Sequence, residues 1–201
     1  MKSTFQLDLK GRVAVFIDAA NVLYSQKDMG WEIDYKKLMA YLKSSGNIVY
    51  VGFYYGVIES NLGQKRFFKM LVDRGYTLRT KPVKFIKTKQ GIERKGNLDV
   101  ELAFDIWQWK EKFDTCVLMS GDSDFEVVLD DLERSGKTIL VFSARGHVAR
   151  ELIKLANKYV PFERIRGEVE RKNHPAEAGD VYSGKIVSSL SRKVKRNGQS
   201  K

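Results

Sequence analysis

Short apolar runs alternate along this chain with longer segments of helical periodicity, and this alternation most constrains its fold. The clearest runs are residues 13–18 (VAVFID), 115–119 (TCVLM) and 138–142 (TILVF), with residues 47–55 and 77–86 as further candidate strands. Strands that are apolar throughout and linked by helices are typical of a parallel sheet covered on both faces. The pattern therefore predicts an α/β fold. The carboxyl ends of its strands would form the edge where ligands usually bind.

Helical periodicity fills most of the intervals between these runs. The clearest helix spans residues 97–113, where Leu98, Leu102 and Ile106 recur every four residues and would share one face. Capping residues and glycines mark the ends of other helices, which we predict over residues 34–45, 60–75 (capped by Ser60 or Asn61), 124–135 and 148–158. The intervening expectations are a loop through Trp31, a polar turn over 87–96 and a short edge strand over 162–165.

Length and composition suit one domain with a tail. The chain has 201 residues, of which 43% are hydrophobic, enough to fill a core. We expect an N-terminal extension over residues 1–11, a folded domain over 12–166 and a basic, polar tail over 167–201. Apolar residues at every fourth position from Ile186 to Val194 would suit a short helix in the tail.

Cysteine usage and hydropathy narrow the class of protein. Cys116 is the only cysteine, which excludes a disulfide framework and any cysteine-based zinc site. No run of about 18 uncharged apolar residues is present, and Asp8 and Lys10 precede the first apolar run. We therefore expect a soluble, cytoplasmic protein without a membrane partner, in which Cys116 is a small buried hydrophobe.

Positive charge is concentrated in one segment of the chain. The net charge is +11, and residues 64–95 hold eleven Lys and Arg against two acidic residues. Such a surplus favours a polyanionic partner such as a nucleic acid. The residues that would bind its phosphates are Lys65, Arg66, Lys81, Lys84, Lys87, Lys89, Arg94 and Lys95. The alternative is that this segment is only the solvated face of a helix and an edge strand.

Acidic residues follow the predicted strands at their carboxyl ends. Asp18 closes the first strand, Asp122 and Asp124 follow the 115–119 strand, and Asp99 lies in the first turn of the long helix. All four belong to one edge of the sheet, and Asn21 can join them. Each acid alone could simply cap a turn or a helix. Together they would repel one another unless a cation lay between them.

The chemistry of these side chains favours a hard divalent cation. The chain has no cysteine set and its histidines stand only at positions 147 and 174, so oxygen ligands for Mg²⁺ or Mn²⁺ are expected rather than a zinc site. Such ions activate a bound water and neutralise charge on a phosphodiester. Dinucleotide-binding, Walker A and GxSxG patterns are absent, which weakens the nucleotide-binding and serine-hydrolase hypotheses.

Three motifs, residues 16–21 (FIDAAN), 95–100 (KGNLDV) and 120–125 (SGDSDF), resemble those of LabA-like NYN domains in the PIN-like nuclease superfamily. The resemblance implies a Rossmann-like three-layer sandwich with strand order 3-2-1-4-5 and metal-dependent cleavage of RNA. It matches Asp18, Asp99, Asp122 and Asp124 to the acidic catalytic and metal positions of the family, and Asn21 to its asparagine. Asp105 matches another acid of the family, but it stands about 600° of helix rotation beyond Asp99 and should point elsewhere.

The leading hypothesis is thus an endoribonuclease that uses Mg²⁺ or Mn²⁺ to hydrolyse single-stranded or structured RNA. One alternative is a non-catalytic RNA-binding or regulatory module with the same fold. A third is a phosphohydrolase of small nucleotides, which would not need the long basic segment. The sequence leaves open whether the protein is a monomer or a homodimer.

Overall fold

A computed structural model describes residues 5, 7–57, 62–88 and 91–172. Its centre is a six-stranded parallel sheet in the order β3-β2-β1-β6-β7-β8. These strands are β1 (Arg12–Asp18), β2 (Asn47–Val57), β3 (Thr77–Pro82), β6 (Thr115–Met119), β7 (Thr138–Ser143) and β8 (Lys158–Pro161). The predicted order of the first five strands is confirmed, and β8 adds a sixth at the edge.

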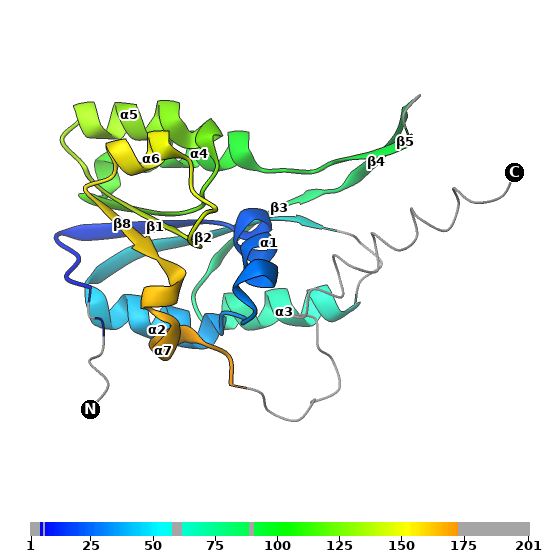
Figure 1. Cartoon of the computed structure of the whole chain (residues 1–201), viewed down its shortest axis with the longest axis horizontal. Coiled ribbons are helices and arrows are strands. Elements are labelled where there is room, and N and C mark those ends of the chain that lie inside the picture. Colours follow the sequence, from blue (N-terminus) through cyan, green and yellow to red (C-terminus); the bar gives the residue numbers. More distant parts are fainter. Residues whose placement is uncertain (1–4, 6, 58–61, 89–90, 173–201) are drawn as a thin grey trace, which may run out of the picture.

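Helices cover both faces of the sheet (Figure 1). One face carries α4 (Asp99–Trp109), α5 (Glu126–Arg134) and α6 (Arg150–Leu155), and the other carries α2 (Tyr35–Ser45), α3 (Leu62–Asp73) and α7 (Arg166–Val169). Side chains of β1 alternate between the two layers, because Val13, Val15 and Ile17 belong to one apolar core while Ala14 and Phe16 belong to the other. The molecule is therefore the α/β three-layer sandwich that the apolar strands predicted.

The predicted loop after the first strand is wrong, because residues Ala19–Met29 form helix α1. Asp18 caps this helix and Gly30, with φ of 70°, ends it. The helix buries Ser25 and Gln26 beside Ala19 and Val22, so its inner face is partly polar. Hydrophobic periodicity, the main sequence signal for a helix, is therefore weak here.

The predicted strand over 77–86 is shorter in the structure, and a β-hairpin takes the place of its end and of the predicted turn over 87–96. The third sheet strand ends at Pro82, which has no backbone N–H to continue a ladder. The chain then forms an antiparallel hairpin of β4 (Lys84–Thr88) and β5 (Gly91–Lys95), which projects from the body (Figure 1). A side chain at Gly56, near the end of β2, would lie 2.7 Å from the Gly96 carbonyl oxygen, so this segment returns close to the sheet.

The last helix is shorter than predicted and the edge strand comes earlier. Helix α6 ends at Leu155, and Asn157 Oδ1 then accepts a 2.6 Å hydrogen bond from the Ile139 N–H of β7. That bond fixes the chain beside β7, so residues 158–161 form β8, and residues 162–164 form a 3-10 turn instead of the predicted strand. The predicted caps Ser60 and Asn61, and the predicted tail helix, lie outside the described residues.

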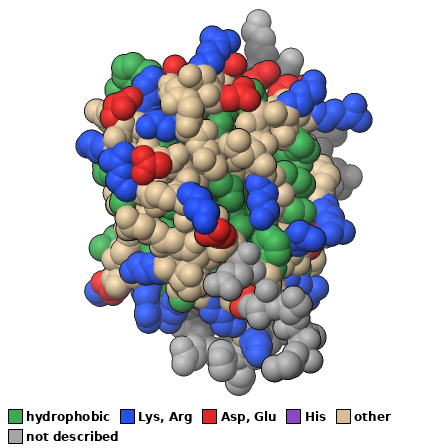
Figure 2. Space-filling model, turned by 90° about the vertical axis from the view of Figure 1, so that its left-hand side faces the viewer, with side chains coloured by type: hydrophobic (Ala, Val, Ile, Leu, Met, Phe, Trp, Pro, Cys, Tyr) green, Lys and Arg blue, Asp and Glu red, His purple; other side chains and the backbone are tan. Residues whose placement is uncertain are grey.

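The surface of the described chain mixes charge of both signs with small apolar areas. Figure 2 shows the left-hand side of the view in Figure 1, where Lys and Arg side chains are spread over the face with acidic side chains among them. Among the described residues, no helix has the length and apolar character needed to cross a membrane.

Candidate metal centre

The acidic residues meet where the order of the sheet reverses, between β1 and β6. Asp18 is the last residue of β1, Asp99 is the first residue of α4, and Asp122 and Asp124 stand in the loop and 3-10 turn that follow β6. Adjacent parallel strands whose connections leave in opposite directions open a crevice at this point. The sheet topology thus brings together carboxylates that are more than 100 residues apart.

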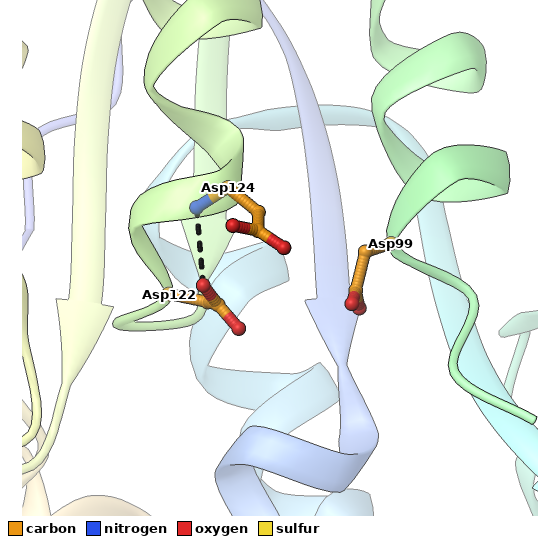
Figure 3. A group of neighbouring side chains, drawn as sticks. All are labelled: Asp99, Asp122 and Asp124. Atoms are coloured by element: carbon orange, nitrogen blue, oxygen red, sulfur yellow. Dashed lines mark hydrogen bonds between the residues drawn. The ribbon is translucent and has the colours of Figure 1, made fainter. Parts of the chain in front are cut away.

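Asp99, Asp122 and Asp124 form a compact cluster, here called the acidic triad (Figure 3). One carboxylate oxygen from each lies within 4.8 Å of the others. The Asp122 side chain accepts a 3.0 Å hydrogen bond from the backbone N–H of Asp124, which holds both carboxylates on one short turn. Across the crevice, Asn97 Nδ2 donates to Asp99 at 2.6 Å.

Asp18 lies beside the triad but its carboxylate is engaged elsewhere. One oxygen accepts from the backbone N–H of Asn21 at 3.2 Å, and the other accepts from the Ser120 hydroxyl at 2.9 Å. Only 6% of Asp18 is exposed. The Ser120 hydroxyl in turn accepts from the backbone N–H of Asp122 at 3.2 Å. Asp18 therefore braces the loop that carries two members of the triad.

Burial and nearby negative charge raise the proton affinity of two carboxylates of the site, Asp99 and Asp18. Burial, together with the charges of Asp18, Asp122 and Asp124, raises the pKa of Asp99 to about 6. Burial also raises the pKa of Asp18, although the hydrogen bonds from Asn21 and Ser120 oppose that shift. A group whose pKa rises because of its acidic neighbours is one that a cation would stabilise in its charged form.

Asn21 and Gly121 fix the shape of the loop after β6. Asn21 Oδ1 accepts a 3.1 Å hydrogen bond from the Gly121 N–H, so this side chain orients the backbone next to Asp122. Gly121 packs so tightly against the following strand's loop that an added Cβ would lie 1.6 Å from the His147 carbonyl oxygen. The Gly121 carbonyl accepts from Ala149 N–H at 2.9 Å. The loops after β6 and β7 are thereby locked together.

Asp105 points away from the triad, as its helical position predicts. It is 4% exposed, accepts from Arg79 Nε and Nη2 at 2.8 and 2.9 Å, and accepts from the Tyr54 hydroxyl at 2.8 Å. This network ties α4 to β2 and β3. The roles of Arg79, Tyr54 and Ser120 were missed by the sequence analysis. A serine directly after an entirely apolar strand was the available signal for Ser120.

The basic candidates whose side chains the structure describes lie on three elements: α3, β3 and the first strand of the hairpin. Lys65 and Arg66 are exposed on α3, and Lys84 is exposed at the start of the hairpin. Lys81 donates to Glu101 at 2.6 Å, so its charge is already paired. Lys87 lies on β4, and Arg94 and Lys95 lie on β5. Their side chains, and the whole of Lys89, lie outside the described part of the chain.

The acidic triad fits a small divalent cation. Around Mg²⁺, bonds of about 2.1 Å place adjacent oxygens about 3.0 Å apart and opposed oxygens about 4.2 Å apart, so the three oxygens, which lie within 4.8 Å of one another, would converge on the ion by side-chain rotation. All the donors are carboxylates, which suits Mg²⁺ or Mn²⁺ better than zinc. Cys116 is buried in β6 and its burial raises the pKa of its thiol, so it offers no ligand.

A Rossmann-like sandwich with acids at its topological switch point defines a class of α/β proteins to which PIN-like domains belong. The chain belongs to the NYN domain family, whose model matches residues 12–163. It is 34% identical over 168 residues to low amplitude and bright protein LabA of Synechococcus elongatus, covering 82% of this chain and 90% of that protein. It is thus a LabA-like NYN domain protein. NYN domains are generally nucleases, so nucleic acids are the molecules on which the family generally acts.

A solved structure shares the fold. The crystal structure of a Vibrio parahaemolyticus protein of unknown function superposes with a TM-score of 0.69, covering 83% of this chain and all of the other. The two sequences are 24% identical, so this similarity supports the architecture and says nothing about activity.

Proposed function

We propose that this protein is a metal-dependent endoribonuclease. The observation that carries the proposal is the acidic triad of Asp99, Asp122 and Asp124 at the edge of an NYN domain. Mg²⁺ or Mn²⁺ held there would supply a hydroxide-like water and neutralise charge on the phosphodiester. The reaction class is therefore hydrolysis of an RNA backbone.

The other residues of the site would act through position and charge. Asp18 and Asn21 keep the loop of Asp122 and Asp124 in place through Ser120 and Gly121, so they are positioning residues in this proposal. Lys65, Arg66 and Lys84 would bind phosphates of the strand outside the acidic triad, because a carboxylate cluster alone repels RNA. We place the protein in the cytoplasm, where a reduced Cys116 is expected.

The test is cleavage of end-labelled RNA by the wild type in Mn²⁺, by the wild type in EDTA, and by Asp122→Asn in Mn²⁺. We expect no products in EDTA, and cleavage by the variant slower by at least about a hundredfold, as for the loss of one catalytic electrostatic group. Asp130→Asn is the matched control, because Asp130 pairs with Arg134 on α5 outside the triad and should retain full activity. Equal cleavage in all reactions would overturn the proposal.

A non-catalytic RNA-binding module remains the second candidate, favoured by the exposed basic residues that do not depend on the triad. It predicts salt-sensitive RNA binding, no products with any divalent ion, and unchanged affinity in Asp122→Asn. A small-nucleotide phosphohydrolase would be indicated by activity that charge reversal at Lys84 leaves unchanged.

A further inference from the structure

Tyr24 is an exposed aromatic residue at the border of the acidic site. It lies on α1, and 59% of its surface is accessible. A single exposed aromatic side chain needs no explanation by itself. What distinguishes Tyr24 is its position and its neighbours, which come from two separate parts of the chain.

Two chains of contacts connect Tyr24 to the loop of Asp122. On α1, Asn21 stands one turn before Tyr24 and accepts from the Gly121 N–H at 3.1 Å. From the loop after β7, His147 presents its carbonyl against Gly121 and its ring against Tyr24, with centroids 6.2 Å apart in an edge-to-face arrangement. Both routes end one residue before Asp122.

The ring of Tyr24 is held in place and has a cation beside it. His147 Nε2 lies 3.1 Å from a carboxylate oxygen of Asp28, which stands one turn after Tyr24 and so fixes the imidazole against the ring. Lys27 Nζ lies 5.7 Å from the centroid of the Tyr24 ring. An exposed, oriented aromatic ring can stack on a nucleobase, and a nearby ammonium group can bind the phosphate of the same nucleotide.

The position of this ring complements the basic residues. Lys65 and Arg66 lie on α3, which packs against β3, and Lys84 begins β4, which follows β3 along the chain. His147 follows β7, on the other side of the switch point between β1 and β6. A strand held by the basic residues and crossing the acidic triad would next reach α1 and the loop after β7. Its bases would have to be unstacked to meet the ring.

We propose that Tyr24, flanked by Lys27 and His147, stacks on a base of single-stranded RNA beside the cleaved phosphodiester. This inference rests on the proposed function and narrows its substrate to single strands, since a paired base cannot offer its face to the ring. The tyrosine hydroxyl has no part in the stacking, so phenylalanine should replace it.

The test measures the affinity of the full chain for a short oligouridylate, on an Asp122→Asn background that prevents turnover and removes one negative charge. Tyr24→Ala should weaken binding by about 5- to 100-fold, as for the loss of one base–aromatic stack. Tyr24→Phe should bind within about twofold of the parent. Trp107→Ala is the matched control, since Trp107 is 52% exposed with Lys110 Nζ 5.9 Å from its ring, but lies about 12 Å along α4 from Asp99.

A second arm locates the stacked base. Oligouridylates with one abasic ribose at successive positions should bind the parent weakly at one position, and Tyr24→Ala should lose that sensitivity. Equal affinities for the parent and Tyr24→Ala, or an abasic effect that persists in Tyr24→Ala, would overturn the inference. So would a loss of binding in Trp107→Ala alone, which would assign the stacking to α4.

Failure of this inference is distinguishable from failure of the proposed function. Metal-dependent cleavage that is lost in Asp122→Asn, combined with binding that ignores Tyr24, would remove only the stacking site. Absence of any binding to oligouridylate by the parent would overturn the stacking site, and the cleavage assay would then decide the proposed function separately.

Discussion

At the scale of single residues, Asp99 bears the electrostatic strain of the site. Burial of its carboxylate, together with the charges of Asp18, Asp122 and Asp124, raises its pKa from 3.8 to about 6. The folded state therefore binds the Asp99 proton more tightly than the unfolded chain does. Ionised Asp99 destabilises the metal-free fold above about pH 6, and this destabilisation fades as the pH falls toward 4.

This sign predicts that Asp99→Asn is more stable than the wild type in EDTA. Melting temperatures at about pH 8 should rise by a few degrees in the variant, because asparagine cannot ionise, and the gain should disappear near pH 4. With Mn²⁺ the order should reverse, since only the wild type gains stability by binding the ion. A variant that is less stable than the wild type in EDTA at pH 8 would contradict the account. The control Asp130→Asn keeps the triad, so Mn²⁺ should stabilise it as much as the wild type.

Residue chemistry also explains which parts of the site could be predicted. The sequence allowed all four acids to be assigned to one edge of the sheet, because apolar strands have recognisable ends and the carboxyl ends of parallel strands share an edge. It did not show that Asp99, Asp122 and Asp124 form a triad while Asp18 is a buried residue that supports the loop of Asp122 and Asp124. That difference depends on the hydrogen bond between Asp18 and Ser120, which are 102 residues apart.

At the scale of elements, the network of Arg79, Tyr54 and Asp105 holds α4 against the sheet. Asp105 is almost completely buried on α4, while its partners belong to β2 and β3. The hydroxyl of Tyr50 lies 3.2 Å from that of Tyr54, and the Tyr50 ring packs 4.3 Å from that of Trp109. Since α4 begins at Asp99, this network sets the position of one wall of the acidic triad.

Removing the cation of this network should therefore be costly. In Arg79→Ala the buried carboxylate of Asp105 loses both hydrogen bonds from Arg79 and keeps the one from the Tyr54 hydroxyl. We expect this to lower the free energy of unfolding by about 1–3 kcal/mol. Arg79→Lys keeps the charge but not the two-pronged geometry, so its loss should be smaller. Urea unfolding measures both. Lys69→Ala, which breaks the exposed pair with Asp73 on α3, is the control and should change stability by less than about 1 kcal/mol. Equal effects of Arg79→Ala and Lys69→Ala would show that the network does not anchor α4.

Elements were predictable where burial alone decided them. Strands β1, β6 and β7 are apolar because they are covered on both faces, and their predicted limits agree with the structure to within a residue. Helix α1 was missed because its buried face includes Ser25 and Gln26. The hairpin depends on the end of the β2–β3 pairing at Pro82, and β8 depends on the hydrogen bond between Asn157 and β7. Both are tertiary contacts, which local sequence patterns do not reveal.

At the scale of the whole molecule, the net charge of +11 does not by itself outline an RNA-binding surface. Several basic side chains are paired within the fold, including Arg79 and Lys81, and others are spread over the face seen in Figure 2. Lys65 and Lys84 are exposed, on α3, which packs against β3, and at the start of β4, which follows β3. They are the clearest candidates for phosphate contacts.

Charge reversal should show which lysines contact RNA. Lys65→Glu and Lys84→Glu should each weaken binding for all sequences alike and lower the slope of log affinity against log salt by about 1. Lys10→Glu is the control, because Lys10 pairs with Asp8 and precedes the amino end of β1, opposite the acidic edge. A salt slope unchanged by Lys65→Glu and Lys84→Glu would place the RNA elsewhere on the molecule.

The central claim is that the sheet edge of this NYN domain holds a divalent metal ion on Asp99, Asp122 and Asp124. The most direct measurement is anomalous scattering from crystals of the full chain soaked in Mn²⁺. We expect a manganese peak in contact with oxygens of all three carboxylates, and no such peak in Asp122→Asn crystals. A wild-type crystal in which manganese binds other carboxylates and leaves the triad empty would contradict the claim.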